Sequence, residues 1–143
     1  MPKALIENSR CVLALVRKNV REQNVSCSWH VLYNLVMAER EFLIYLDPET
    51  RLCRYRHYHV SKGRKIVEFR IQLEVFVDEE WYPVVRYDTA HGKPHRDILQ
   101  PNGEQTKDWF EGYSVEDVLT IGQKDIMDNW PAYRDSFVKE MER

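Results

Sequence analysis

Long apolar runs, paired cysteines and glycine-rich loops are all missing from this sequence. The longest apolar runs, at residues 11–16 and 31–38, fall far short of the ~20 residues that cross a bilayer, so we expect a cytoplasmic chain with no membrane partner. The three cysteines show no CxxC spacing, which favours free thiols over disulfides. None of the five glycines builds a phosphate-binding loop, so nucleotide hydrolysis is not expected.

The chain has the size of one compact domain. Its 143 residues are 43% hydrophobic, and a chain of this length buries roughly 70% of the surface that it exposes when unfolded. No repeat, low-complexity stretch or Gly/Ser linker divides it. The sequence therefore predicts a single domain over residues 1–143.

Charge is distributed unevenly, although the net charge is only −2. Residues 51–70 carry seven basic side chains against the single acid Glu68, whereas residues 98–143 carry five basic and ten acidic ones. A basic segment interleaved with tyrosine and histidine suits phosphate groups. It equally suits a solvated edge strand whose charges oppose aggregation, and both interpretations stay open.

Helical periodicity is found at both ends of the sequence. Apolar residues recur at helical spacing between residues 5 and 20 and between residues 29 and 37, which predicts two N-terminal helices. Residues 42–46 could extend the second helix or form a strand. Near the C-terminus, Ser114 predicts a helix start and Pro131 predicts the first turn of a last helix.

The middle of the sequence shows the alternation of an antiparallel sheet. Residues 65–77 predict one long strand with a core face. Further strands are predicted at 52–60, joined through a Lys62-Gly63 loop, at 81–88, and at 98–100. The expected fold class is α+β, with N-terminal helices, a three- to four-stranded antiparallel sheet, and C-terminal helices packed on one face.

With the Lys62-Gly63 loop, Tyr55 is expected opposite Arg70. With a three-residue loop at 78–80, Gln72 is expected opposite Arg86 and Arg70 opposite Asp88. In this register the polar side chains of the predicted strands gather on one face of the sheet. That face is expected to hold Tyr55, His57, Glu68, Arg70, Arg86 and Asp88. A slip of one residue would place Arg54 and Arg56 there instead.

Residues 86–97, RYDTAHGKPHRD, form the densest polar segment. We interpret His91 and His95 as an acid and base pair, because imidazole can give and take a proton near neutral pH. Asp88 would orient a histidine or pair with Arg70. The residues expected to bind substrate are Arg70, Arg86, Lys93, Arg96, His57 and Tyr55. Such groups suit metal-independent RNA cleavage at a ribose 2′-hydroxyl. The alternative is a purely structural loop, in which Asp88 and Asp97 anchor the histidines or arginines.

Possible metal ligands are present, but not in a known pattern. Cys53, His57 and His59 share strand parity, and His91 and His95 could approach them. No HExxH or CxxC motif is present. No metal and no cofactor are therefore predicted.

The run RYDTAHGKPHRD, with the strands before it, resembles small prokaryotic proteins grouped around the TumE-type toxins of toxin–antitoxin pairs. The resemblance covers residues 66–97. It implies an antitoxin partner and an RNA target. The expected outline of two helices followed by a sheet is also similar to the RelE-like ribonuclease toxins, at the level of fold alone.

Two classes of function are thus expected. The first is a toxin-like ribonuclease that uses histidine and arginine chemistry. The second is a non-catalytic module that binds nucleic acid or protein through the basic hairpin, with a metal-binding protein as a further alternative. The sequence leaves open whether the chain is an enzyme.

Overall fold

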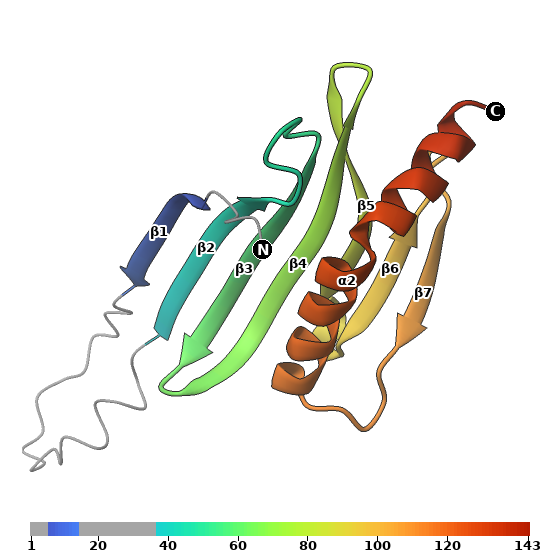
Figure 1. The fold of residues 1–143 in the computed structure, drawn as a ribbon. Coiled ribbons are helices and arrows are strands. Elements are labelled where there is room, and N and C mark those ends of the chain that lie inside the picture. The colour runs from blue at the N-terminus through green and yellow to red at the C-terminus, as the bar shows by residue number, and fades with distance from the viewer. Residues whose placement is uncertain (1–5, 15–36) are drawn as a thin grey trace, which may run out of the picture.

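The computed structural model describes residues 6–14 and 37–143, and its main element is one antiparallel sheet (Figure 1). The strands follow chain order across the sheet, each hydrogen-bonded to the next. They are β1 Ile6–Ala14, β2 Met37–Tyr45, β3 Cys53–Lys62, β4 Lys65–Val77, β5 Glu80–Asp88, β6 His95–Leu99 and β7 Gln105–Trp109. A short 3-10 turn, η1 Ala90–Gly92, lies between β5 and β6.

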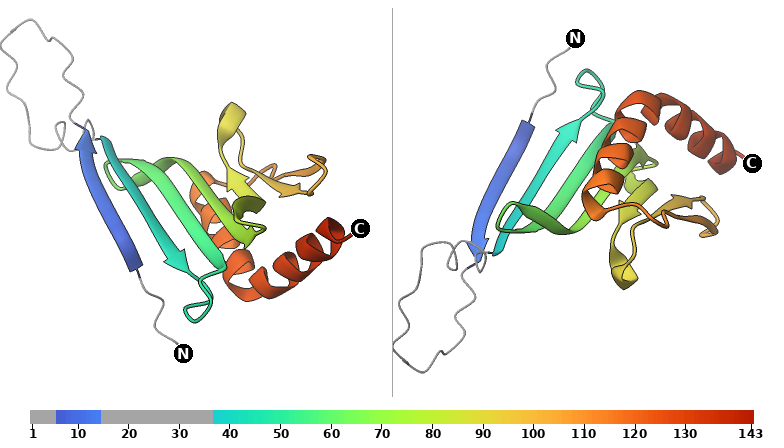
Figure 2. Two further views of the ribbon diagram at one scale, coloured as in Figure 1. Left: turned by 90° about the horizontal axis from the view of Figure 1, so that it is seen from above. Right: turned by 90° about the horizontal axis from the view of Figure 1, so that it is seen from below.

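One helix, α2 Val115–Met141, packs on a single face of the sheet against β4 and β5. The Ser114 hydroxyl caps it by accepting a hydrogen bond from the Asp117 backbone N–H, so the predicted helix start is confirmed. The prediction of a second C-terminal helix is wrong, because Pro131 lies inside α2. A proline removes one backbone hydrogen bond and bends a helix, and Figure 2 shows the axis of α2 changing direction.

The core lies between α2 and the middle strands. Gly122 lets the helix approach the sheet, since a Cβ there would lie 2.8 Å from the Cγ atom of Tyr87 and 3.0 Å from the Cδ1 atom of Ile71. The alternation predicted for the long strand is confirmed by the almost fully buried residues of β4. These are Phe69, Ile71, Leu73 and Val75.

The predicted fold class is wrong in its N-terminal part and in the size of its sheet. Residues 6–14, expected in a helix, form β1 and pair with β2. The second expected helix falls mostly on residues 29–36, outside the described part of the chain. Residues 42–45 belong to β2, and the sheet has seven strands. A few apolar residues at helical spacing are a weak signal, which backbone pairing along a sheet edge overrides.

The β4–β5 hairpin places its polar residues as predicted, although its loop is shorter. The loop is the pair Asp78 and Glu79, both with positive φ, and not three residues. A bulge between Leu73 and Glu74 then restores the predicted register. Arg86 therefore lies opposite Gln72, and Asp88 lies opposite Arg70.

The β3–β4 hairpin does not have the predicted register. Tyr55 lies opposite Leu73 instead of Arg70, a shift of three residues that turns every β3 side chain to the other face. The turn falls one residue later than predicted, and a bulge at Val60 and Ser61 adds to the shift. The prediction that Tyr55 and His57 share the polar face is therefore wrong.

The sheet has two chemically different faces, because side chains alternate along each strand. We call the side that packs on α2 the covered face and the opposite side the open face. Register and side-chain contacts place a defined set of polar and aromatic residues on the open face. They are Glu39, Glu41, Tyr45, Arg54, Arg56, Tyr58, Glu68, Arg70, Gln72, Glu74, Phe76, Trp81, Arg86, Asp88, His95, Asp97, Lys107 and Trp109.

Candidate functional site

Two arginines of β3 share one carboxylate on the open face. Arg54 and Arg56 both donate to the carboxylate of Glu74, with the Arg56 Nε atom 2.8 Å from Oε1. Burial alone would raise the pKa of Glu74, but hydrogen bonds from Arg56, Gln72 and Arg54 outweigh it and lower the pKa. This part of the face is therefore an internally satisfied network.

Two further arginines point to the outside. Arg86 donates from Nε to the side-chain oxygen of Gln72 at 3.0 Å, a neutral partner. The side chain of Arg70 is 57% exposed, and its Nε atom lies 3.9 Å from the Asp88 Oδ2 atom. Both guanidinium groups lie on β4 and β5, where a bound anion could reach them.

Aromatic rings extend the open face toward the β4–β5 turn. The ring of Trp81 lies 5.1 Å from that of Phe76 and 6.5 Å from that of Tyr45, measured between centroids. The Arg54 guanidinium stacks over Trp81, 3.7 Å from the ring centroid. Aromatic faces next to arginines are the kind of surface on which single-stranded bases stack.

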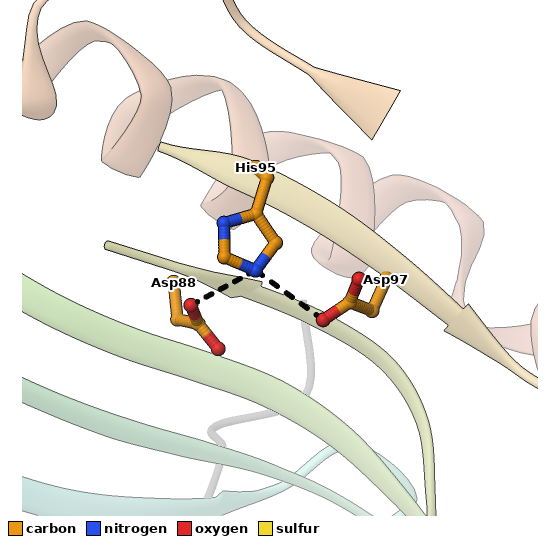
Figure 3. A group of neighbouring side chains, drawn as sticks. All are labelled: Asp88, His95 and Asp97. Atoms are coloured by element: carbon orange, nitrogen blue, oxygen red, sulfur yellow. Dashed lines mark ion pairs between the residues drawn. The ribbon is translucent and has the colours of Figure 1, made fainter. Parts of the chain in front are cut away.

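A buried group of titratable side chains lies where β5 and β6 pair. Asp88, His95 and Asp97 are 4%, 1% and 4% exposed. The His95 Nε2 atom lies 3.1 Å from Asp88 Oδ1 and 3.4 Å from Asp97 Oδ2. Figure 3 shows the two carboxylates approaching the same ring nitrogen from opposite sides. We call these three residues the acid–histidine centre.

The position of the other ring nitrogen fixes the proton on His95. The Nδ1 atom lies 3.0 Å from the Lys93 carbonyl oxygen, and a carbonyl can only accept, so Nδ1 carries a hydrogen. A neutral ring would then present the Nε2 lone pair to two carboxylates. Only a second proton or a cation makes that arrangement favourable.

Two positive groups, Arg70 and Lys107, lie beside the acid–histidine centre, but neither is within hydrogen-bond distance of its carboxylates. The Lys107 Nζ atom lies 3.6 Å from Asp97 Oδ1, which is too far for a hydrogen bond. That oxygen is buried and accepts no hydrogen bond from any described residue. Asp88 Oδ1 accepts from the Ala90 backbone N–H at 2.8 Å. The indole of Trp109 lies 5.0 Å from the His95 ring centroid.

A small cavity lies beside the acid–histidine centre and is lined by one of its three residues, Asp88, and by the acid Glu68. It has a volume of about 130 Å³ and is formed where β3, β4 and the end of β5 meet. Asp88 and Arg70 both line it, together with Tyr58. A ligand in this cavity would therefore contact one carboxylate of the centre and one exposed guanidinium.

The structure brings only some of the predicted site residues together. Asp88 and His95 meet in the acid–histidine centre, with Arg70 and Arg86 on the same face. His91 is exposed on η1, and no hydrogen bond or ion pair of the described residues joins it to His95. Lys93 lies 3.9 Å from Glu111 in an exposed ion pair.

The other predicted substrate-binding residues lie on the covered face. Arg96 donates to Asp108, with its NH2 group at 2.6 Å. Tyr55 and His57 are buried there. Sequence reasoning named Asp97 only in the structural alternative, as an anchor beside Asp88, and missed Lys107 and Trp109. The signal for these two was the alternation of β6 and β7 after Pro94.

A second histidine cluster lies on the covered face of β3. The Tyr55 hydroxyl lies 2.7 Å from His57 Nδ1, and His57 Nε2 lies 2.6 Å from His59 Nδ1. Burial lowers the pKa of His57 to about 4 and also lowers the pKa of His59. Burial raises the pKa of the Cys53 thiol to about 11, so that thiol is unreactive. We call Tyr55, His57 and His59 the tyrosine–histidine chain.

Comparison with known proteins places the chain in a family but gives it no activity. No curated protein and no solved structure matches it, so the resemblance to TumE-type toxins stays a prediction. No helix of the described residues is long and apolar enough to span a membrane. A family model matches residues 37–143, from β2 to the end of the chain. The protein therefore belongs to the family described as Domain of unknown function (DUF7718).

Proposed function

We propose that the open face binds single-stranded RNA and that the acid–histidine centre cleaves its phosphodiester bonds. One observation carries the proposal: a continuous sheet face joins exposed arginine and aromatic side chains to a buried pair of carboxylates around one histidine. Binding groups and reactive groups thus lie on neighbouring strands.

Exposed Arg70 and half-buried Arg86 supply the contact with phosphate. Arg70 and Arg86 have planar guanidinium groups that can hold a phosphate through two hydrogen bonds. Trp81 and Tyr45 offer ring faces for bases at the other end of β5. An RNA strand laid across β5 would therefore meet stacking and phosphate-binding groups in turn.

The reactive end of this path is the cavity beside Asp88. A phosphate held by Arg70 in that cavity meets the acid–histidine centre through the Asp88 carboxylate. The proposal therefore retains Asp88 and His95 from the sequence prediction and adds Asp97. It makes no use of His91, which the fold leaves exposed on η1.

The test is a binding and cleavage assay with the full chain and an unstructured RNA oligonucleotide. We expect Arg70→Ala and Arg86→Ala each to weaken binding and flatten its salt dependence, whereas Arg143→Ala, at the far end of α2, leaves both unchanged. Asp88→Asn should abolish cleavage while leaving binding within a few fold. The matched control is Asp128→Asn, an exposed carboxylate on α2.

Two results would decide against ribonuclease activity. RNA that binds to the open face but stays intact would favour the non-catalytic module. RNA that does not bind, or that Asp88→Asn cleaves as fast as the natural sequence, would overturn the proposal. Co-purification with a small antitoxin-like protein would support the toxin resemblance independently.

A further inference from the structure

We infer that the acid–histidine centre is a binding site for a divalent transition-metal ion, of the kind of Mn²⁺ or Zn²⁺. The two carboxylates and the imidazole present ligand atoms that all lie within 4.8 Å of one another. Metal binding here does not require the proposed ribonuclease activity.

The distances within the centre are those between neighbouring ligands of one ion. Metal–oxygen and metal–nitrogen bonds of about 2.0–2.2 Å place adjacent ligand atoms roughly 3 Å apart. His95 Nε2 lies 3.1 Å from one Asp88 oxygen and 3.4 Å from one Asp97 oxygen. One ion can therefore contact all three groups after a small movement of the carboxylates.

The histidine is oriented as a metal ligand. The Lys93 carbonyl holds the hydrogen on Nδ1 and leaves the Nε2 lone pair directed between the carboxylates. A histidine ligand commonly donates its second ring N–H to a carbonyl in this way. Because an unprotonated nitrogen and two carboxylates repel one another when empty, a cation stabilises the arrangement.

The second indication is the unsatisfied oxygen of Asp97. Asp97 is 4% exposed, and its Oδ1 atom accepts no hydrogen bond from the described residues. A buried carboxylate oxygen that has an ion pair but accepts no hydrogen bond is costly. Rotation of this carboxylate toward an ion would satisfy it, and the Lys107 ammonium at 3.6 Å would remain as an outer neighbour.

The donor set decides the kind of ion. One imidazole nitrogen with two carboxylate oxygens suits Mn²⁺, Fe²⁺ or Zn²⁺, whereas Mg²⁺ and Ca²⁺ prefer oxygen ligands alone. Three protein ligands leave coordination positions open. Asp88 lines the cavity, so those positions are expected to be reached from there.

The test is a titration of the chelator-treated full chain with MnCl₂ or ZnCl₂, followed by calorimetry and, for Mn²⁺, by electron paramagnetic resonance. We expect one equivalent to bind. Asp97→Asn, which keeps the shape of the side chain, should weaken binding by at least about 10- to 100-fold. Lys107→Met should strengthen it severalfold, because a positive charge near the ion is removed. Lys124→Met, on the exposed side of α2, is the matched control and should change nothing.

A measurement on the natural sequence keeps the inference testable if a variant fails to fold. Sub-stoichiometric Mn²⁺ should broaden the amide NMR signals of residues 88 and 95–97 first. Broadening that begins at other residues, binding of less than one equivalent, or unchanged Mn²⁺ affinity in Asp97→Asn would overturn the metal site. Mn²⁺ binding with intact RNA would overturn only the proposed function, and RNA cleavage without any metal binding would overturn only the metal site.

Discussion

The two histidine clusters of this sheet have similar geometry and opposite surroundings. In the tyrosine–histidine chain, His57 lies 2.7 Å from a phenol oxygen and 2.6 Å from another imidazole, and it stacks on Phe42. In the acid–histidine centre, His95 lies 3.1 Å and 3.4 Å from two carboxylate oxygens. Both rings are buried. The difference is the charge of their neighbours.

That difference determines what each cluster can do. The phenol of Tyr55 donates a hydrogen bond to His57, and the N–H of His57 donates one to His59. These hydrogen bonds therefore join neutral groups. Around the Nε2 atom of His95 the two neighbouring groups are both anionic, and one of their oxygens has no hydrogen bond within the described chain. The first cluster is complete as it stands, whereas the second needs a positive charge.

The largest expected effect comes from replacing the central histidine of each cluster, His95 or His57. In the presence of a chelator, the positive charge between the carboxylates is a second proton on His95, so His95→Leu should lower the free energy of unfolding by about 3–5 kcal/mol, because two buried carboxylates lose that partner. His57→Leu should cost only about 1–2 kcal/mol, since neutral hydrogen bonds are lost. Urea unfolding followed by fluorescence measures both, and equal losses would contradict the distinction.

A rescue of the His95→Leu variant tests whether buried charge causes its loss of stability. In the His95→Leu background, changing Asp88 and Asp97 together to asparagine should restore about 1–3 kcal/mol, because the buried charges are removed. Asp108→Asn in the same background is the control, since Asp108 pairs with Arg96 on the covered face. No recovery in urea unfolding would show that packing, and not charge, accounts for the loss.

Local sequence patterns predict much of this fold. The alternation from Phe69 to Val75 predicts β4 because each buried residue faces α2. The cap at Ser114 predicts where α2 begins. The register of β3 could not be derived in this way, because it depends on a bulge at Val60 that no residue type announces. One such bulge moves Tyr55 from the expected face to the other.

The candidate site was predicted only in part for a related reason. Asp88 and His95 stood out because aspartate and histidine are chemically distinctive. Asp97 was named only as a structural anchor and not as a reactive residue, because the strand was expected to start at Ile98, whereas β6 begins at His95. Two residues apart on one strand, His95 and Asp97 share a face, and this juxtaposition follows only once the start of the strand is known.

A third prediction concerns acid pH and the tyrosine–histidine chain. The pKa of His57 is lowered to about 4 in the folded chain, against 6.5 for the ordinary group. Between these values the unfolded chain binds a proton that the folded chain does not, so stability is full above about pH 6.5 and falls as the pH drops toward about 4. His57→Phe should remove this loss, at most about 1.4 kcal/mol per pH unit.

The control for the acid titration is His91→Phe, because His91 is exposed on η1. The measured quantity is the difference in unfolding free energy between each variant and the natural sequence at several pH values. A His57→Phe chain that loses stability as steeply as the His91→Phe chain would show that His57 is protonated in the fold.

The smallest expected effect tests the neutral character of the tyrosine–histidine chain. Burial raises the pKa of Tyr55, so its hydroxyl keeps the hydrogen that it donates to His57 Nδ1 at 2.7 Å. Tyr55→Phe removes one neutral hydrogen bond and should cost about 0.5–1.5 kcal/mol in urea unfolding. The imidazole ¹⁵N spectrum should still show the hydrogen of His57 on Nε2, held there by His59. A much larger loss, or a hydrogen moved to Nδ1, would mean that the phenol sets the state of His57, and the chain would then resemble the acid–histidine centre in depending on one partner.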